Sequence, residues 1–380
     1  MDCSASPTIC DMVSVARIPL PYLTNKTTSG DRSDFDPRSH PMNHFSDAIL
    51  KLLQRQDLSA EEMRDCIGGI MDGRWAEAEI AALLTALRMK GEAVDEIVGA
   101  AQAMQERAVS VASSRTGLLD TCGTGGDRLH TFNISTATAL VAAALTIPVA
   151  KHGNRSVSSS SGSADVLEAL GVKVDVPVPI VTRCLDEIGI GFCFAPLMHG
   201  AMKHAAPVRR TLGFPTIFNL LGPLTNPARA EFQLLGASRN ATAEILASAL
   251  AQLKRARALV VCGNNELDEV SLWGTTTAWD VRGDTVTQLE WTASSFNLDE
   301  CSAEDLRVDS AQESARVIRQ VLAGEPGPHR DVVIANAAAA LLAVGRSEDP
   351  AEAAAMAAEV IDSRAAELLL ANLVALTNAA

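Results

Sequence analysis

The chain has 380 residues, of which 47% are hydrophobic and 21% are charged, and its formal net charge is −14 at pH 7. This length and composition are typical of a soluble globular protein with a large core and room for two domains. The negative charge disfavours binding to nucleic acid or to an anionic membrane surface. No apolar run approaches the roughly 20 residues that span a bilayer. The eight scattered cysteines include no CxxC pair, so we expect reduced thiols in a cytoplasmic protein.

The N-terminal segment, residues 1–41, is rich in Ser, Thr, Pro and Asp and has no apolar periodicity. Such a composition does not supply a core, so we expect a disordered N-terminal extension. The segment also lacks the basic start and the continuous apolar stretch of a secretory signal peptide.

Helical periodicity begins after this extension and continues to about residue 110. Ser59 and Glu62 have the spacing of a capping box, which predicts the start of a helix that Gly73 can end. Two further stretches with helical apolar spacing follow before the pattern changes. We therefore expect a small all-helical domain over residues 42–112.

Beyond residue 116 short apolar runs alternate with helical ones. Such alternation predicts an α/β domain, here residues 113–380, with a mainly parallel sheet covered by helices. Its Ala-rich end is expected to be helical and to pack on the sheet. The runs and helical segments are 118–121, 134–145, 147–150, 164–170, 180–188, 190–195, 259–262, 331–344 and 351–373.

A glycine-rich stretch at 120–127, DTCGTGGD, lies between an apolar pair and a helix-like run. Glycines allow backbone N–H groups to approach an anion closely, and the N-terminus of the next helix adds its dipole. The spacing fits neither the dinucleotide fingerprint nor the Walker loop, and a plain strand-to-helix turn is the alternative. The segment 131–136, TFNIST, can cap that helix or face the same anion.

A second polar stretch at 151–163, KHGNRSVSSSSGS, follows another apolar run and precedes a helix. Lysine, arginine, asparagine and hydroxyl side chains at the carboxyl end of a parallel strand suit a ligand with phosphate and hydroxyl groups. A flexible serine linker is the alternative.

Two more segments carry charge in an informative context. Asp268 and Glu269 follow an apolar strand and a Gly-Asn-Asn turn, and adjacent carboxylates can hold Mg²⁺ together with ligand phosphates. Adjacent surface acids without a role are the alternative. A basic stretch at 199–210 contains Arg209, whose planar guanidinium suits a carboxylate, although an exposed basic helix needs no special role.

In this order, the motifs resemble those of the anthranilate phosphoribosyltransferases, enzymes of tryptophan biosynthesis. The resemblance runs from about residue 43 to the C-terminus and is carried by DTCGTGGD, HTFNIST, KHGNRSVSS, GSADVLEALG, VRRTLG, FNLLGPLTNP and LDE. It implies a helical domain and a larger α/β domain of the nucleoside-phosphorylase-like type. It also implies that helices from about 196–213 return to the helical domain, and that a homodimer forms through that domain.

The resemblance further implies the residues of the site. Anthranilate would contact Gly123, Asn154, Arg209 and His199, and Mg²⁺ would be held by Ser135, Asp268 and Glu269. The implied contacts of 5-phosphoribosyl 1-pyrophosphate are Gly123, Gly126, Asp127, Thr131, Asn133, Ile134, Ser135, Thr136, Lys151, His152, Gly153, Asn154, Arg155, Ser156, Val157, Ser158, Ser159 and Ser163.

The implied activity is transfer of the phosphoribosyl group to the amine of anthranilate, with release of pyrophosphate and without a covalent nucleophile. A pyrimidine nucleoside phosphorylase-like enzyme would share the fold, but its own phosphate loops are not found in this sequence. A non-enzymatic relative that binds nucleic acid would need basic surface charge, which the net charge of −14 opposes. The chain departs from the family pattern at Gly200, at 262–266 and at 273–276.

Overall fold

The computed structural model describes residues 44–155 and 162–379. The expected disorder of residues 1–41 and the candidate ligand contacts Ser156, Val157, Ser158 and Ser159 lie outside these residues. Within them, no helix is long and apolar enough to cross a membrane. All six cysteines in the described ranges are free thiols, as expected.

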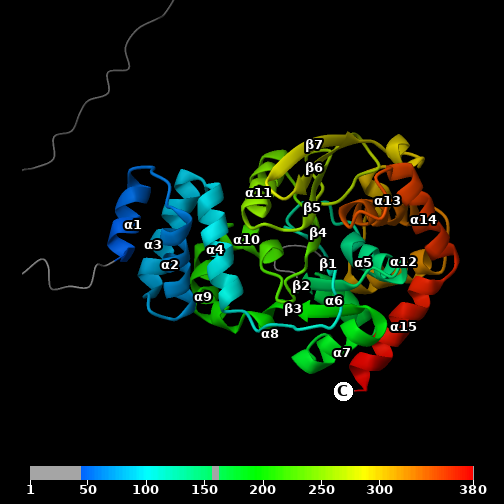
Figure 1. Ribbon diagram of the computed structural model, residues 1–380, viewed down its shortest axis with the longest axis horizontal. Helices are drawn as coiled ribbons and strands as arrows, with labels where there is room; N and C mark the ends of the chain where they lie inside the picture. The colour runs from blue at the N-terminus through cyan, green and yellow to red at the C-terminus, as the bar shows by residue number, and fades with distance from the viewer. Residues whose placement is uncertain (1–43, 156–161, 380) are drawn as a thin grey trace, which may run out of the picture. The chain divides into compact units, whose positions relative to one another are not determined.

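Four helices open the described part, and Figure 1 shows them side by side in blue and cyan. The predicted capping box at Ser59 and Glu62 is present at the start of the second helix, which ends just before Gly73. The short segments η1 and α9 contact α2 and α3 and share a core with them. The domain boundaries at residues 42–112 and 113–380 stay predictions. The helices are α1 (His44–Leu53), α2 (Ala60–Met71), α3 (Glu77–Lys90), α4 (Val94–Glu106), η1 (Gly200–His204) and α9 (Ala206–Leu212).

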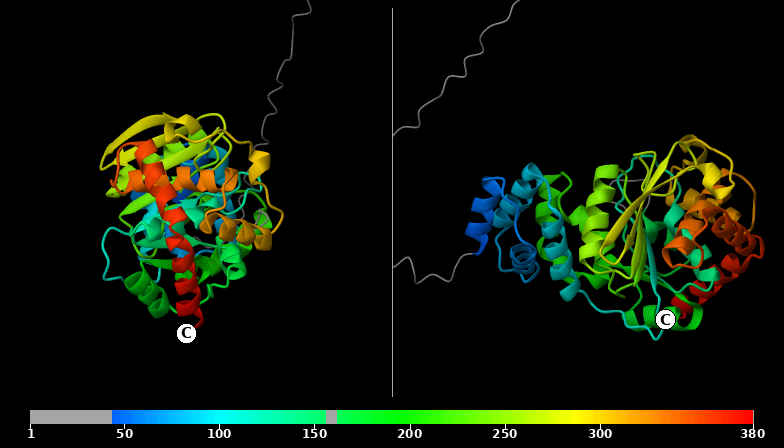
Figure 2. Two further views of the ribbon diagram at one scale, coloured as in Figure 1. Left: turned by 90° about the vertical axis from the view of Figure 1, so that its right-hand side faces the viewer. Right: turned by 45° about the horizontal axis from the view of Figure 1, so that its top comes forward.

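A seven-stranded sheet of order β3-β2-β1-β4-β5-β6-β7 forms the centre of the α/β part. Strands β1 to β5 pair in parallel, which confirms the predicted mainly parallel sheet. The antiparallel hairpin β6–β7, yellow in Figure 2, was not predicted from the sequence. The strands are β1 (Leu119–Gly123), β2 (Val149–Gly153), β3 (Ile190–Phe194), β4 (Phe232–Gly236), β5 (Arg257–Gly263), β6 (Thr276–Arg282) and β7 (Thr285–Trp291).

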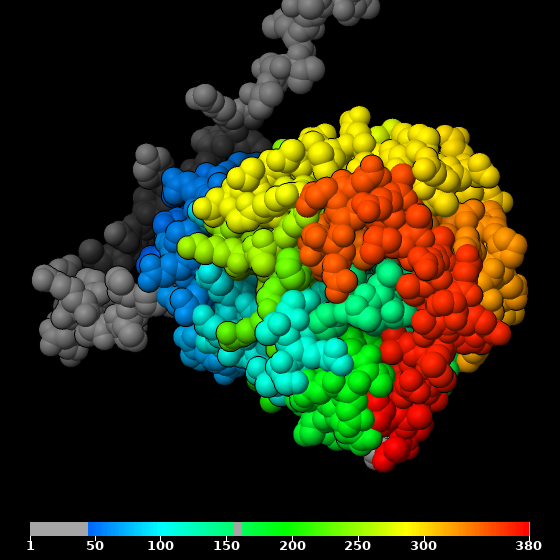
Figure 3. All heavy atoms as spheres, turned by 45° about the vertical axis from the view of Figure 1, so that its right-hand side comes forward, coloured from blue at the N-terminus to red at the C-terminus, as the bar shows by residue number. Residues whose placement is uncertain are grey.

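Alternate residues of the strands face two different cores. In β5, Leu259 and Val261 pack with α5 and the C-terminal helices, whereas Ala258 and Val260 pack with α11 and the core of α2–α4. In Figure 3 the orange and red C-terminal helices spread over one face of the molecule. The helices around the sheet are α5 (Ile134–Ala144), α6 (Ser163–Ala169), α7 (Val178–Ile188), α8 (Ala195–Met198), α10 (Phe218–Leu221), α11 (Asn240–Gln252), α12 (Ala311–Leu322), α13 (Pro328–Ala343), α14 (Pro350–Asp362) and α15 (Ala365–Asn378).

The C-terminal segment differs in detail from the expectation. The stretch 351–373 contains parts of two helices, because α14 ends at Asp362 and α15 begins at Ala365. Arg364 between them has a φ of 61°, a left-handed conformation that stops the first helix and redirects the chain. The predicted helical character is confirmed, and the break inside the segment was missed.

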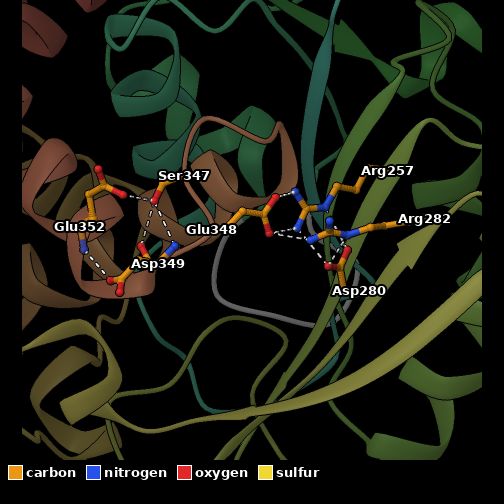
Figure 4. A network of polar contacts seen from close by, with 7 residues as sticks. All are labelled: Arg257, Asp280, Arg282, Ser347, Glu348, Asp349 and Glu352. Carbon is orange, nitrogen blue, oxygen red and sulfur yellow. Dashed lines mark hydrogen bonds and ion pairs between the residues drawn. The ribbon is translucent and has the colours of Figure 1, made fainter.

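An ion-pair network joins the connection between α13 and α14 to the sheet (Figure 4). Arg257 of β5 lies 2.9 Å from Asp280 of β6 and 2.9 Å from Glu348 of the connection. Arg282 also reaches Asp280, at 2.8 Å. Next to Glu348, Asp349 accepts hydrogen bonds from the first backbone N–H groups of α14 and so caps that helix. The network therefore anchors the connection between α13 and α14 to β5 and β6.

Replacing Arg257 with methionine is expected to lower the free energy of unfolding by about 1–3 kcal/mol, because Asp280 is buried and would keep only Arg282 as a partner. Arg183→Ala is the matched control, since its i,i+4 pair with Glu187 is exposed and is worth less than about 0.5 kcal/mol. Urea unfolding of both variants checks the difference. Equal losses of unfolding free energy in the two variants would show that the buried network stabilises the fold no more than an exposed ion pair does.

Candidate active site

The predicted site segments meet at the carboxyl ends of the parallel strands, where α/β sheets bind ligands. β1 ends at Gly123 beside Gly236 of β4, and the backbone N–H of Thr124 donates to the carbonyl of Gly236 at 2.9 Å. The turn that carries Asp268 and Glu269 follows β5, the neighbour of β4. The glycine-rich stretch 120–127 (the glycine loop), the end of β4 and the turn after β5 are distant in the sequence. They nevertheless share one edge of the sheet.

Glycines at the ends of β1 and β4 make room for the acidic turn, the turn that carries Asp268 and Glu269. A Cβ on Gly123 would lie 2.2 Å from Oδ2 of Asp268, and a Cβ on Gly236 would lie 1.6 Å from the carbonyl oxygen of Asp268. No side chain fits at such distances, so the turn lies directly across both strand ends. Gly123 was predicted as a ligand contact only, and Gly236 was not predicted at all.

Asp268 and Glu269 are partly buried next to a third carboxylate, that of Asp127. Burial and the nearby charge of Asp127 raise the pKa of Asp268 to about 7, although the N–H of Gly125 donates to its Oδ2 at 2.7 Å. Burial and the charge of Asp268 raise the pKa of Glu269 well above its usual range, while the backbone N–H of Ser135 points at its carboxylate. Ionising both Asp268 and Glu269 is therefore unfavourable without an added cation.

Lys151 is the buried cation beside these carboxylates. Its Nζ donates to the carbonyl of Thr121 at 2.6 Å and to Oγ of Ser135 at 3.1 Å. Burial lowers the pKa of Lys151, and the charge of Asp120 is the largest of the opposing influences. Asp120 in turn accepts a hydrogen bond from the backbone N–H of His152 at 3.0 Å. These contacts tie the ends of β1 and β2 to the start of α5.

The donor set fits a magnesium ion. Asp268, Glu269 and Ser135 offer hard oxygen atoms, and the ionised forms of the two carboxylates would be stabilised by a divalent cation. The described residues contain no group of three or more His, Cys, Asp or Glu side chains that could hold a metal by themselves. Mg²⁺ usually keeps water and ligand phosphates in its coordination shell, so an incomplete protein shell agrees with this ion.

The segment 131–136 opens α5, and the backbone N–H of Ser135 within it points at the carboxylate of Glu269. Asn133 caps the helix, since its Oδ1 accepts from the N–H of Thr136 at 3.1 Å. Its own N–H donates to Oγ of Ser314 at 2.9 Å, which fastens the segment to α12. The side chain of Ile134 is buried in the core, so Ile134 can offer a ligand only its backbone.

The second predicted loop is only partly brought to this edge. Asn154 is exposed, and its carbonyl accepts from the N–H of Ala164 at the start of α6. Arg155 forms ion pairs with Asp165 at 3.0 Å and Glu168 at 2.5 Å. The structure therefore holds the Arg155 guanidinium against α6 rather than directing it at the glycine loop, where the resemblance had suggested a phosphate contact.

Two buried histidines face each other on the other side of β2. The rings of His152 and His199 are 5.1 Å apart, and Nδ1 of His152 lies 3.0 Å from the carbonyl of Gly222. Burial lowers their pKa values to about 4 and about 3, so both rings are neutral at physiological pH. Among the described residues, Nε2 of His152 has no hydrogen-bond partner. The His199 ring lies close to a backbone group of Thr225 without forming a well-aligned hydrogen bond. All three nitrogens are buried, so a role of His199 in ligand binding stays a prediction.

Arg209 of α9 lies near the segment that leads to Gly222. Its guanidinium carbon is 5.4 Å from the centre of the Phe218 ring, a cation–π contact. Burial lowers the pKa of Arg209, and no carboxylate in the described part of the chain pairs with it. A half-buried, unpaired guanidinium on an aromatic ring is suited to a planar carboxylate.

The comparisons with known proteins agree with this geometry. Residues 46–108 match the helical bundle domain of a glycosyl transferase family, and residues 115–367 match its α/β domain. An anthranilate phosphoribosyltransferase from Geobacter sp. (strain M21) is 47% identical over 347 residues, which cover 88% of this chain and 99% of the relative. The chain belongs to the anthranilate phosphoribosyltransferase family.

Solved structures of anthranilate phosphoribosyltransferases superpose well on this chain. The enzyme from Thermus thermophilus has a TM-score of 0.82 at 41% identity, and the match covers 87% of this chain and 99% of that one. The Saccharomyces cerevisiae enzyme, solved with phosphoribosyl pyrophosphate and Mg, also has a TM-score of 0.82, at 27% identity and with 90% and 99% coverage. The expected family and fold class are therefore confirmed.

Two of the departures from the family pattern contact each other. Oε1 of Glu266 accepts a hydrogen bond from Nδ2 of Asn264 at 2.9 Å and another from Nε1 of Trp273 at 2.8 Å. The unusual residues at 262–266 and 273–276 thus support one another outside the acidic turn. These contacts involve neither Asp268 nor Glu269.

Proposed function

We propose that this chain transfers the phosphoribosyl group of 5-phosphoribosyl 1-pyrophosphate to the amine of anthranilate, giving N-(5-phosphoribosyl)anthranilate and pyrophosphate. Relatives that the chain matches over 86–88% of its length carry this enzyme's name. Solved relatives from Saccharomyces cerevisiae contain phosphoribosyl pyrophosphate with Mg, or 4-fluoroanthranilate. The proposal includes use of Mg²⁺, a homodimer and a cytoplasmic location.

The donor side of the site consists of the glycine loop, the start of α5 and the acidic turn. Backbone N–H groups of the glycine loop and the positive end of the α5 dipole suit the phosphates of the donor. Ser135, Asp268 and Glu269 would hold Mg²⁺, which when bound neutralises charge on the leaving pyrophosphate. Lys151, which already donates to Ser135, holds this hydroxyl in place and adds a positive charge near the phosphates. Thr131, Asn133 and Ser163 remain proposed contacts of phosphoribosyl pyrophosphate.

The strongest support for an anthranilate-binding site is the guanidinium of Arg209, which pairs with no carboxylate among the described residues. Anthranilate presents a carboxylate next to its amine, so pairing with Arg209 orients the amine toward the ribose. A pyrimidine nucleoside has no carboxylate for this guanidinium, which disfavours the phosphorylase alternative. The buried His199 and the exposed Asn154 are further proposed contacts of the acceptor.

In the reaction, the amine nitrogen forms a bond to the anomeric carbon while the bond from that carbon to the pyrophosphate oxygen breaks. The amine then loses a proton to solvent. An aryl amine is sufficiently nucleophilic once positioned, so the protein acts by orientation and by stabilising charge. No side chain needs to form a covalent intermediate.

Replacing Arg209 with alanine is expected to raise the KM for anthranilate about 10–100-fold, because a charge-assisted pair is lost, with little change in the KM for the donor. Arg210→Ala is the matched control, since the neighbouring Arg210 is exposed. Steady-state kinetics with each substrate varied in turn separates the two constants. Equal increases in both KM values would remove Arg209 from the acceptor site.

A further inference from the structure

One polar side chain lies inside the otherwise apolar helix α13. Asn336 is fully buried, and its neighbours on this helix from Val332 to Ala343 are all apolar. A buried amide is costly unless its hydrogen bonds are made, and alanine or leucine would suit the position better for packing alone. The sequence predicted only a packing role for this Ala-rich helix.

The amide of Asn336 bonds to the backbone of a single residue outside its own helix. Its Oδ1 accepts from the N–H of Val270 at 2.8 Å, and its Nδ2 donates to the carbonyl of Val270 at 3.0 Å. Nδ2 also donates to the carbonyl of Val332, one turn earlier in α13, at 2.8 Å. Asn336 therefore uses both ends of its amide to hold both backbone groups of Val270, much as a neighbouring strand would.

Val270 directly follows the acidic pair, so this contact fixes the peptide that joins Glu269 to Val270. The next residue, Ser271, is held from the sheet, because its N–H donates to Oγ1 of Thr276 at 2.9 Å. The end of β5, paired with Thr276 in the sheet, also approaches closely: a Cβ on Gly263 would lie 2.8 Å from the carbonyl oxygen of Glu269. The backbone of the acidic turn is thus held between the sheet and α13.

Such support matters because the acidic turn carries crowded negative charge. Asp127, Asp268 and Glu269 repel one another when ionised, and a loosely held turn would relieve this repulsion by moving apart. A metal site needs its ligands fixed in advance, and the groups that orient the ligands affect metal affinity strongly.

We propose that Asn336 is a positioning residue for the divalent cation. Its bonds to Val270 hold Glu269 at a fixed distance from Ser135 and from the glycine loop. At this distance the cation and the pyrophosphate of the donor can bind together. This inference rests on the proposed function for the identity of the ligand. It assigns to the C-terminal helical layer a direct part in shaping the metal site.

The test compares Asn336→Leu, which leaves both backbone groups of Val270 without a partner, with Thr377→Val. Thr377 is a buried residue of α15 whose hydroxyl also serves the backbone, accepting from Lys173 and donating to Leu373. Both variants are expected to lose stability in urea. Mn²⁺ is titrated into each in the presence of phosphoribosyl pyrophosphate, and bound Mn²⁺ is measured by electron paramagnetic resonance.

For Asn336→Leu we expect the Mn²⁺ dissociation constant to rise about 10–100-fold, the usual effect of removing a group that orients a ligand. Thr377→Val should stay within about twofold of the wild type, since a purely structural loss leaves the metal site intact. If Asn336→Leu fails to fold, Asn336→Ala replaces it, because the smaller side chain leaves room for a water and should give an intermediate loss.

A folded Asn336 variant that binds Mn²⁺ as tightly as the wild type would overturn the positioning role, whatever its activity. The proposed function fails separately, if the wild type binds Mn²⁺ but transfers no phosphoribosyl group to anthranilate. The titration still decides the role of Asn336 in that case.

Discussion

The double variant Asp268→Asn/Glu269→Gln is expected to lose turnover by about 10³-fold or more, because both carboxylates proposed to hold the cation become neutral. Its folded state should be at least as stable as the wild type without metal. Burial raises the pKa values of both acids, as do the charge of Asp127 for Asp268 and the charge of Asp268 for Glu269, so the ionised forms oppose folding at neutral pH and the amides remove that cost. Activity and stability should therefore change in opposite directions.

Glu266→Gln is the matched control for this double variant. Glu266 lies two residues before Asp268 and bonds to Asn264 and Trp273 rather than to the site. Its amide can still accept both hydrogen bonds, so turnover should fall less than about threefold. Turnover at several Mg²⁺ concentrations and urea unfolding with chelator supply the two readouts. Full activity in the double variant would exclude the metal role of the pair.

Gly236→Ala is expected to have the second largest effect, although Gly236 carries no functional group. The added Cβ would lie 1.6 Å from the carbonyl oxygen of Asp268, and backbone must move to accommodate it. Overpacking of this kind costs about 1–3 kcal/mol of stability. Displacing the acidic turn by about 1 Å should lower turnover about 10²-fold.

Gly200→Ala provides the control for the glycine substitution. A Cβ on Gly200 meets no heavy atom within 4 Å, and Gly200 has an ordinary φ in the short helix η1. Its turnover and its urea midpoint should stay close to those of the wild type. If Gly236→Ala keeps wild-type turnover, the close contact between β4 and the acidic turn is not needed for catalysis.

Local patterns in the sequence predicted much of this molecule correctly. The capping box at Ser59 and Glu62 marks a helix start through contacts within three residues, and the structure contains it. The alternation of apolar runs predicts parallel strands because buried strands between helices are continuous apolar segments. The strand-loop-helix order around 120–136 follows from the same local signals.

Features that depend on residues distant in the sequence were missed. The hairpin β6–β7 has a mostly exposed second strand whose polar residues show no strong apolar alternation. Gly236 and Asn336 act on the acidic turn from another strand and from a C-terminal helix. No local pattern indicates such contacts, because they exist only once the sheet and its helical layer have formed.

Charged and aromatic side chains of one predicted loop point in different directions. Arg155 pairs with acids on α6, and His152 packs against Gly222 and His199, while Lys151 turns toward Ser135. A motif predicts which residues lie at a strand end, but alternate residues of a strand face opposite sides. The residue-by-residue assignment of ligand contacts in this loop stays a prediction.

The central claim, phosphoribosyl transfer to anthranilate, is tested most directly by following anthranilate fluorescence after mixing purified protein with phosphoribosyl pyrophosphate. With Mg²⁺ present the fluorescence should decline as the amine is consumed, and a chelator should stop the decline. A folded protein that leaves the fluorescence unchanged at saturating Mg²⁺ would contradict the claim.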